Sequence, residues 1–481
     1  MLNETANIVD AGTVFSVAGV LHVLLVAIAG YHVLLNKQNE AAAFSWLGII
    51  VLSPFFGVGL YWLFGINRIK RRARAEMPGS INTRSPRSTG VIPALNDVEP
   101  ARWQGLMRLG TAIHHCDYLQ NNRLRPLING DETYPEMLKA IASSKNSVVL
   151  SSYIFEYDII GRQFVDELIA ANQRGVSVRV LIDGLGVGYG LSLVRSDRVL
   201  RQHGVKTARF LSAMSSMGTR FINLRNHRKI LSVDGRIAYV GGMNIRDNNV
   251  LKQTTKECTL DVHFQVEGPI IDQINEAFAE DWLFAAKEAL EMPRWQGVFA
   301  GSVTSRVLLD GPDTNFQKLQ MTMVAAINAA RSRVRIATPY FLPGLTIINA
   351  LHLAVLRGVR IDILVPGKNN LAFVGWAMQA NEGKLLAHGV HLHESPQPFD
   401  HSKLFTVDDE WSLIGSSNWD PRSLDLNFEI NLECYSPSLN AEISRIFDVK
   451  CAAARHVTQA RKHGLPARLR NNFFRLFSPY L

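Results

Sequence analysis

The 481-residue sequence contains few cysteines and none of the spacings that cysteine-based sites require. Its four cysteines, Cys116, Cys258, Cys434 and Cys451, are scattered, and no CxxC pair occurs. This usage excludes a disulfide framework and a cysteine-ligated zinc site, and it is typical of a reducing compartment. The sequence also lacks a cluster of carboxylates that could hold Mg²⁺. We therefore expect no metal and no cofactor.

Formal charge is absent from two long apolar stretches near the start of the sequence. Residues 13–35 and 44–66 contain no Asp, Glu, Lys or Arg, and each is long enough to cross a bilayer. Only NKQNEAAA lies between them, so we predict a transmembrane helical hairpin. A signal peptide is the alternative for the first stretch, but the preceding MLNETANIVDAG has acidic residues and no basic one.

Acidic residues are fewer than basic ones, 42 against 51, which gives a formal net charge of +9. Five of the basic residues follow the second apolar stretch directly, in NRIKRRARA at 67–75. By the positive-inside rule the part of the chain that follows faces the cytoplasm, so we expect a multi-pass membrane protein with a cytoplasmic catalytic part. The excess positive charge indicates an anionic partner, either lipid or nucleic acid.

The segment NHRKILSVDG at 226–235 brings a histidine, a lysine and an aspartate together. His227 and Lys229 project from the same face of an extended strand and can share a ligand. Asp234 has the opposite parity and precedes Gly235, so it is better placed to fix a hairpin turn. Such a pair alone is commonplace in a protein core.

The motif occurs twice, because HSKLFTVD at 401–408 repeats its spacing. Six residues later each copy reaches a small pair and an asparagine, in GGMN and GSSN. SSKNSVVLSSYIF at 143–155 likewise parallels AARSRVRIATPYF at 329–341. A repeat of this length indicates a domain duplication. The corresponding residues are His227 and His401, Lys229 and Lys403, Asp234 and Asp408, and Asn244 and Asn418.

Buried-looking strands alternate with helical stretches within each copy, as VRVLID and IDILVP do with RQFVDELIAANQ and LTIINALHLAVL. This alternation predicts an α/β fold of two mixed-sheet lobes flanked by helices. One reactive pair in each copy predicts a single site at the lobe interface. We place the hairpin in 1–66, a basic segment and flexible tether in 67–105, the first lobe in 106–300, and the second lobe with a C-terminal tail in 301–481.

A carboxylate follows each motif at a comparable position, Asp261 in TLDVHFQVEG and Glu429 in LNFEINLECY. An imidazole that presents a neutral nitrogen to phosphorus needs an acceptor on its other nitrogen. We expect both acids to orient the histidines. A salt bridge to a nearby arginine is the alternative.

Two imidazoles, two ammonium groups and two amides form a pocket suited to a phosphate diester. One histidine attacks phosphorus, and the other protonates the departing alkoxide and then deprotonates the acceptor. The lysines supply the positive charge that metal ions supply elsewhere.

The paired motifs and their extensions resemble the phospholipase D superfamily over residues 125–455. Within it, the two apolar stretches, NHRKILSVDG, TPYF at 338–341 and GSSNWDPRSLDLNFE at 415–429 resemble bacterial cardiolipin synthases. The resemblance implies a protein of the bacterial cytoplasmic membrane that transfers a phosphatidyl group between two phosphatidylglycerols and releases glycerol. It implies anionic phospholipids as partners, and His227 as nucleophile with His401 as acid and base. It also implies catalytic motif residues His227, Lys229, Asp234, His401, Lys403 and Asp408, phosphate-binding Asn244 and Asn418, and imidazole-orienting Asp261 and Glu429.

Three other functions are compatible with a duplicated motif of this kind: a hydrolytic phospholipase D, a membrane-anchored nuclease and an inactive scaffold. A nuclease would be expected to carry aromatic stacking platforms near the motifs, but residues 226–244 are mostly aliphatic, so no nucleic-acid partner is expected. Two complete motifs argue against a scaffold. Nothing in the sequence separates hydrolysis from transfer. Residues 210–224 and 468–477 are candidates for membrane contact, and packing against the catalytic core explains each equally well.

Overall fold

The computed structural model divides into two compact units, Met1–Arg72 and Ala73–Leu481. It describes residues 11–37, 40–62, 92–93, 95, 100–114, 116–186, 194–211, 224–252, 258–312, 315 and 317–478. The basic segment at 67–75, most of the predicted tether and most of residues 210–224 lie outside these residues.

In the N-terminal unit the described residues form three apolar helices, α1 (Ala11–Asn36), α2 (Glu40–Leu52) and α3 (Pro54–Leu60). Of the described helices, α1 alone is long and apolar enough to cross a bilayer, through Gly19–Asn36. The second predicted span is divided at Ser53, because Pro54 lacks the amide that would continue the helix and begins α3 instead. The helices pack through a small apolar cluster, and His32 Nδ1 lies 2.8 Å from the Tyr61 hydroxyl.

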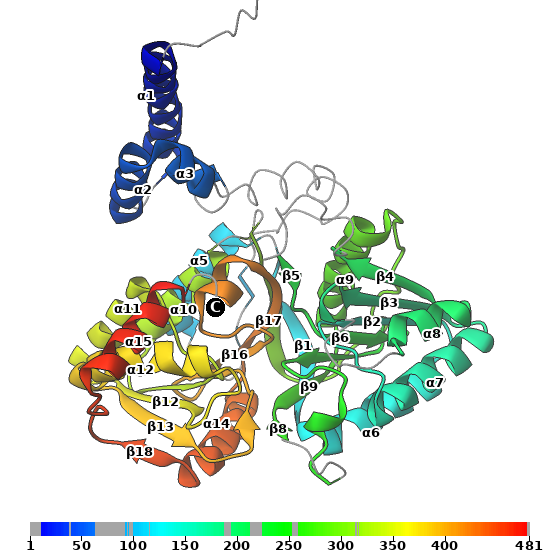
Figure 1. Ribbon diagram of the computed structural model, residues 1–481. Helices are drawn as coiled ribbons and strands as arrows, with labels where there is room; N and C mark the ends of the chain where they lie inside the picture. The colour runs from blue at the N-terminus through cyan, green and yellow to red at the C-terminus, as the bar shows by residue number, and fades with distance from the viewer. Residues whose placement is uncertain are drawn as a thin grey trace, which may run out of the picture. The chain divides into compact units, whose positions relative to one another are not determined.

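The second unit is built on a mixed sheet to which the described residues contribute sixteen strands (Figure 1). In the first lobe the order is β1 (Leu119–Ile128), β9 (Val262–Glu267), β7 (Ile237–Gly241), β6 (Ile230–Val233), β2 (Ser147–Ser152), β3 (Ser177–Asp183) and β4 (Lys206–Phe210). In the second lobe it is β10 (Val303–Asp310), β17 (Asn427–Tyr435), β16 (Trp411–Gly415), β15 (Leu404–Val407), β11 (Arg333–Ala337), β12 (Arg360–Pro366), β13 (His391–Ser395) and β18 (Arg455–Val457).

The two lobes therefore repeat one strand order, with β18 added at the edge of the second. In each lobe three strands run parallel, β2 with β3 and β4, and β11 with β12 and β13, and the other strands in these orders pair antiparallel. The sixteenth strand, β5 (Arg225–Asn226), pairs parallel with β17. Antiparallel pairing of β1 with β10 joins the two halves into one sheet. The duplicated α/β fold predicted from the sequence is confirmed.

Helices cover the sheet of both lobes, and each lobe has its own apolar core (Figure 1). The inner parallel strands β3 and β12 are apolar runs because helices shield both of their faces from water. The first-lobe helices are α6 (Asn129–Ala142), α7 (Ile159–Gln173), α8 (Ser196–Gln202) and α9 (Ile270–Ala286). The second-lobe helices are α10 (Lys318–Ala329), α11 (Leu345–Leu356), α12 (Ala372–Ala387), α13 (Pro421–Asp425), α14 (Pro437–Ala452) and α15 (Leu465–Leu476).

Helix α5 (Pro100–Ile113) precedes the first lobe in the sequence but packs in the second. Trp103 is fully buried in the second-lobe core, and its indole N–H donates to Glu410 at 2.6 Å. The expected boundary between tether and first lobe at 105/106 falls inside this helix. The chain is thus anchored to the second lobe before it forms the first.

Candidate active site

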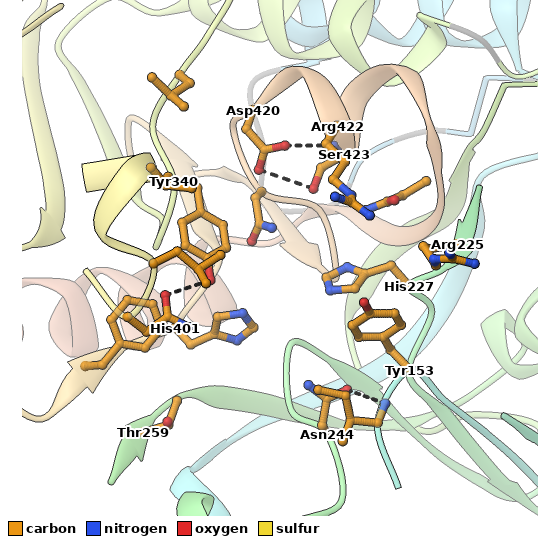
Figure 2. Close-up of a pocket in the computed structure, with 18 of the residues that line it drawn as sticks. Tyr153, Arg225, His227, Asn244, Thr259, Tyr340, His401, Asp420, Arg422 and Ser423 are labelled. Carbon is orange, nitrogen blue, oxygen red and sulfur yellow. Dashed lines mark hydrogen bonds between the residues drawn. The ribbon is translucent and has the colours of Figure 1, made fainter. Parts of the chain in front are cut away.

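The two lobes enclose a pocket of about 200 Å³ that is lined by residues of both repeat copies. Figure 2 shows the rings of His227 and His401 facing one another across it. Asn244 and Asn418 also line the pocket. The structure therefore brings together the histidines and asparagines that the sequence placed 174 residues apart in the two copies.

Two short parallel bridges connect each histidine with the opposite lobe. β5 (Arg225–Asn226) pairs with the start of β17, and β14 (Phe399–Asp400) pairs with β8 (Thr259–Leu260). As a result, the His227 amide donates to the Phe428 carbonyl at 2.9 Å. The His401 amide donates in the same way to the Leu260 carbonyl at 2.7 Å. His227 thus directly follows a strand that pairs with the residue before Glu429. His401 follows a strand that pairs with the residue before Asp261.

The carboxylate of the second lobe orients the histidine of the first. His227 Nδ1 lies 2.9 Å from Glu429 Oε1 and 3.0 Å from Oε2. Ser416 donates its hydroxyl to Glu429 Oε2 at 2.5 Å, and Asn427 Nδ2 donates to Oε1 at 3.1 Å. Because a carboxylate only accepts, His227 carries its proton on Nδ1 and leaves Nε2 with a free lone pair.

The reciprocal pair joins His401 of the second lobe to Asp261 of the first, with Nδ1 2.9 Å from Oδ2. The Val262 amide donates to the other oxygen, Oδ1, at 2.8 Å. Gly242 leaves the space that this carboxylate occupies, since a Cβ there would lie 2.8 Å from both of its oxygens. Each acid thus accepts a hydrogen bond from the histidine of the other copy.

Burial is the main influence on the histidines and lowers the pKa of both His227 and His401 to about 4. For His227, Glu429 opposes this effect, whereas for His401 the charge of Lys403 adds to it. Burial would raise the pKa of Asp261, but Lys403 and the His401 hydrogen bond outweigh it and hold that pKa below its usual range. Both imidazoles are therefore neutral at pH 7, and Asp261 is charged.

The two lysines of the motifs lie buried behind their histidines. Lys229 Nζ donates to the His227 carbonyl at 2.6 Å, and Lys403 Nζ donates to the His401 carbonyl. Burial lowers the pKa of Lys229 to about 7 and that of Lys403 to about 8, although Glu429 and Asp261 oppose the shift. The ammonium groups therefore titrate near neutrality, where a nearby anion stabilises their charged form.

Asp234 and Asp408 do not line the pocket but fix two turns, where they adopt φ of 54° and 50°. Three successive amides donate to each carboxylate. The donors are Lys145, Asn146 and Ser147 for Asp234, and Arg331, Ser332 and Arg333 for Asp408. This agrees with the turn role expected for Asp234. Both aspartates position the hairpins that carry the motif and do not contact the pocket.

Comparisons with known proteins bear on what this site is. The family described as "Cardiolipin synthase, PLD-like domain" matches residues 137–282 and 323–450, one segment in each lobe. The chain belongs to this family. A second family, "Phospholipase_D-nuclease N-terminal", matches residues 23–65.

Curated relatives match this phospholipase D-like chain over nearly its whole length. Cardiolipin synthase A of Pseudomonas fluorescens is 31% identical over 94% of this chain and 96% of its own. Cardiolipin synthase 1 of Bacillus cereus is 28% identical over 98% of this chain and 95% of its own. Among solved structures, a phosphatidylserine synthase of Haemophilus influenzae shares the fold, with a TM-score of 0.63 at 15% identity over 78% of this chain and all of that one.

Two tyrosines of this phospholipase D-like pocket were not singled out by the sequence. The rings of Tyr153 and His227 lie edge to face at 5.1 Å, and those of Tyr340 and His401 at 6.3 Å. The repeat contains the signal that could have identified them, because SSYIF and TPYF place a tyrosine at the same point of each copy. Each tyrosine forms a wall beside one catalytic imidazole (Figure 2).

The pocket departs from twofold symmetry in its charge. Two residues before the histidine, the first copy has Arg225 and the second has Phe399, and both line the pocket. Four residues after the asparagine, the second copy has Arg422 in the pocket wall where the first has Asn248. The His227 side therefore carries two guanidinium groups, and Figure 2 shows both at that end. The second copy contributes most of the apolar lining, namely Leu342, Leu371, Val374 and Phe399, while the charged Arg246 and Asp420 also line the pocket.

Proposed function

We propose that this membrane-associated chain is a cardiolipin synthase that transfers a phosphatidyl group from one phosphatidylglycerol to another and releases glycerol. The observation that carries the proposal is the pair of neutral imidazoles, each held through Nδ1 by the other lobe's carboxylate, in one shared pocket. Such a pair can supply one nucleophile and one acid and base for phosphoryl transfer. The near-full-length relatives named cardiolipin synthases support the choice of substrates.

In the first step, Nε2 of His227 attacks the phosphorus of the donor lipid. An N–P bond forms while the P–O bond to the glycerol headgroup breaks, and His401 gives its proton to the departing alkoxide. Glu429 stabilises the positive charge that develops on the His227 ring. His401 must bind a proton beforehand, and the negative charge of the bound phosphodiester raises its pKa from about 4 toward neutrality.

In the second step, a hydroxyl of a second phosphatidylglycerol gives its proton to His401 and attacks phosphorus. The new O–P bond replaces the N–P bond, so cardiolipin leaves and neutral His227 is regenerated. Asp261 stabilises the imidazolium form of His401 in this step, since its carboxylate accepts the hydrogen bond from Nδ1–H. The sum of both steps consumes two phosphatidylglycerols and yields one cardiolipin and one glycerol.

Buried cations and amides bind the reacting phosphate. Lys229 and Lys403 offset its charge, and their lowered pKa values rise toward ordinary ones beside an anion. Asn244 and Asn418 donate from their amides to its oxygens. The Asn418 Oδ1 atom is buried without a hydrogen-bond partner among the described residues, so it can accept from a glycerol hydroxyl.

The membrane arrangement completes the proposal. Helix α1 and the shorter helices α2 and α3 form a multi-pass anchor in the bacterial cytoplasmic membrane, with the catalytic unit in the cytoplasm. The apolar stretches at 13–35 and 44–66 and the basic segment at 67–75 support this orientation.

A product assay tests the proposal. The full-length protein is incubated in mixed micelles with phosphatidylglycerol labelled in its terminal glycerol, and the products are identified by mass spectrometry. Cardiolipin and glycerol in equal amounts are expected, and His227→Ala serves as the inactive control. Phosphatidic acid as the main product would make the chain a hydrolase instead. Cleavage of single-stranded DNA without lipid turnover would make it a nuclease.

A further inference from the structure

Helix α15 has one face that packs on the catalytic unit and an opposite face that is exposed to solvent. Its sequence LPARLRNNFFRL contains three arginines and no acidic residue. At about 100° per residue, the positions of Leu465, Leu469, Phe473 and Leu476 fall within an arc of about 80° on one side. Phe474 and Asn471 project from the opposite side.

The inner face attaches α15 to α12. The Phe474 ring packs at 5.1 Å from Trp376 and 6.3 Å from Phe373. Asn471, which is buried, donates to Gln379 at 3.2 Å. Phe474 also joins the apolar cluster of Val374 and Leu342, two residues that line the active-site pocket. Helix α15 therefore supports the apolar wall of the pocket from behind.

Among the residues that the structure describes, none covers the outer face, although it is strongly apolar. Leu465, Leu469, Phe473 and Leu476 are 66%, 63%, 55% and 70% exposed. Arg468 lies on one side of this stripe and Arg470 on the other, and both are exposed. An apolar stripe of this size with basic flanks is the pattern of helices that lie in the headgroup region of a bilayer.

We propose that α15 lies in the plane of the membrane interface and presents the apolar side of the pocket to anionic phospholipid. The inference rests on the proposed function, because it concerns the route by which lipid reaches that pocket. The stripe inserts among acyl chains while Arg468 pairs with lipid phosphates. The Arg470 guanidinium lies 4.2 Å over the Trp376 ring and helps to attach the helix to α12. The link to the pocket is direct, since α15 packs on α12 and its Phe474 shares an apolar cluster with the pocket-lining Leu371 and Val374.

Charge favours lipid over a second copy of this chain as the occupant. In a twofold contact the same surface meets itself, so the arginines of α15 would face those of the partner helix. No acidic residue of α15 could compensate them. A bilayer of phosphatidylglycerol offers both acyl chains and the complementary negative charge.

Photocrosslinking distinguishes the possible occupants. A Phe473→benzoylphenylalanine variant of the full-length chain is reconstituted in phosphatidylglycerol vesicles, irradiated and examined by mass spectrometry. A phospholipid adduct at this position is expected. The matched control is Val449→benzoylphenylalanine on α14, whose side chain is 67% exposed, and it should yield less than about a tenth of the lipid adduct. Crosslinks to a second copy, or equal lipid adducts at both positions, would overturn the proposal.

Kinetics on two forms of one substrate give an independent test. In a Leu469→Asp/Phe473→Asp variant, the bilayer phosphatidylglycerol needed for half-maximal rate should rise about tenfold or more. Turnover of monomeric dihexanoyl phosphatidylglycerol should stay within about twofold of the unaltered protein. Val449→Asp should change neither value. Equal loss on both substrates would overturn the proposal, whereas absence of turnover of the monomeric lipid by the unaltered protein would refute the proposed function itself.

Discussion

Each lobe's carboxylate holds the histidine of the other lobe, and this arrangement predicts which step of the reaction each carboxylate affects. If Glu429 serves His227, then Glu429→Gln slows formation of the covalent intermediate, even though residue 429 lies in the second copy. With a leaving group that needs no proton, Asp261→Asn instead slows only the consumption of the intermediate, because Asp261 serves His401. An assignment of each acid to the histidine of its own copy predicts the reverse.

The contacts around Glu429 set the size of the effect. In Glu429→Gln the amide group can face Ser416, which also accepts hydrogen bonds, while Oε1 still accepts from His227 and Asn427. Orientation of the ring is therefore kept, and what is lost is the negative charge opposite a developing imidazolium. Loss of one such electrostatic contact costs about 10²- to 10³-fold in rate, or about 2.7–4 kcal/mol.

Rapid quench of a phosphatidyl ester of p-nitrophenol measures both steps, because this leaving group needs no proton. The unaltered enzyme releases a burst of nitrophenol. Glu429→Gln should slow that burst about 10²- to 10³-fold. Asp261→Asn should keep the burst and accumulate a phosphatidyl adduct on the peptide containing Asn226–Lys229. Accumulation in Glu429→Gln, or an adduct on the His401 peptide, would refute the reasoning.

Four other outcomes follow from the site. Activity should persist in EDTA because Lys229 and Lys403 supply the positive charge, and a complete loss that Mg²⁺ restores would contradict this. Binding of a non-cleavable phosphonate analogue of the substrate, measured by calorimetry, should weaken roughly 10- to 100-fold from pH 6 to pH 9. The reason is that Lys229, with a pKa of about 7, loses its proton as pH rises, and a flat pH profile would count against a phosphate-binding role for this lysine. Asp408→Asn should lower the free energy of unfolding by about 2–4 kcal/mol in thermal melts and leave kcat within about tenfold of the unaltered protein at low temperature. An unchanged melt with lost activity would show that Asp408 takes part in the reaction itself. A cysteine placed at residue 80 should react with a membrane-impermeant reagent only after the cytoplasmic side is exposed, and labelling of intact cells would reverse the topology.

Repetition made much of the site predictable from the sequence. His227 and His401 were found because the same spacing occurs twice, and the parity of strands placed each beside its lysine. The duplicated sheet followed from parallel flanking segments such as 143–155 and 329–341. These features are local or internal to one copy, where periodicity and spacing carry the information.

Contacts between the lobes could not be read in this way. The pairing of Glu429 with His227 depends on β5 lying beside β17, and β5 has only two residues, which are too few to carry a pattern. The burial of Arg228 against Asp281, at 2.8 Å, likewise depends on how α9 packs. Pro54 shows a different limit, because composition predicted one apolar span where a single missing amide divides the helix.

The exchange of acids also constrains how the two halves can evolve. A gene duplication at first gives two copies that are free to diverge, and in many duplicated proteins one copy then degenerates. Here a substitution that displaces either acid removes the hydrogen bond that orients the histidine of the other half. Each repeat is therefore under selection for the function of the histidine in the other repeat. A single lobe, expressed without the other, would contain a histidine and a carboxylate that cannot act on one another.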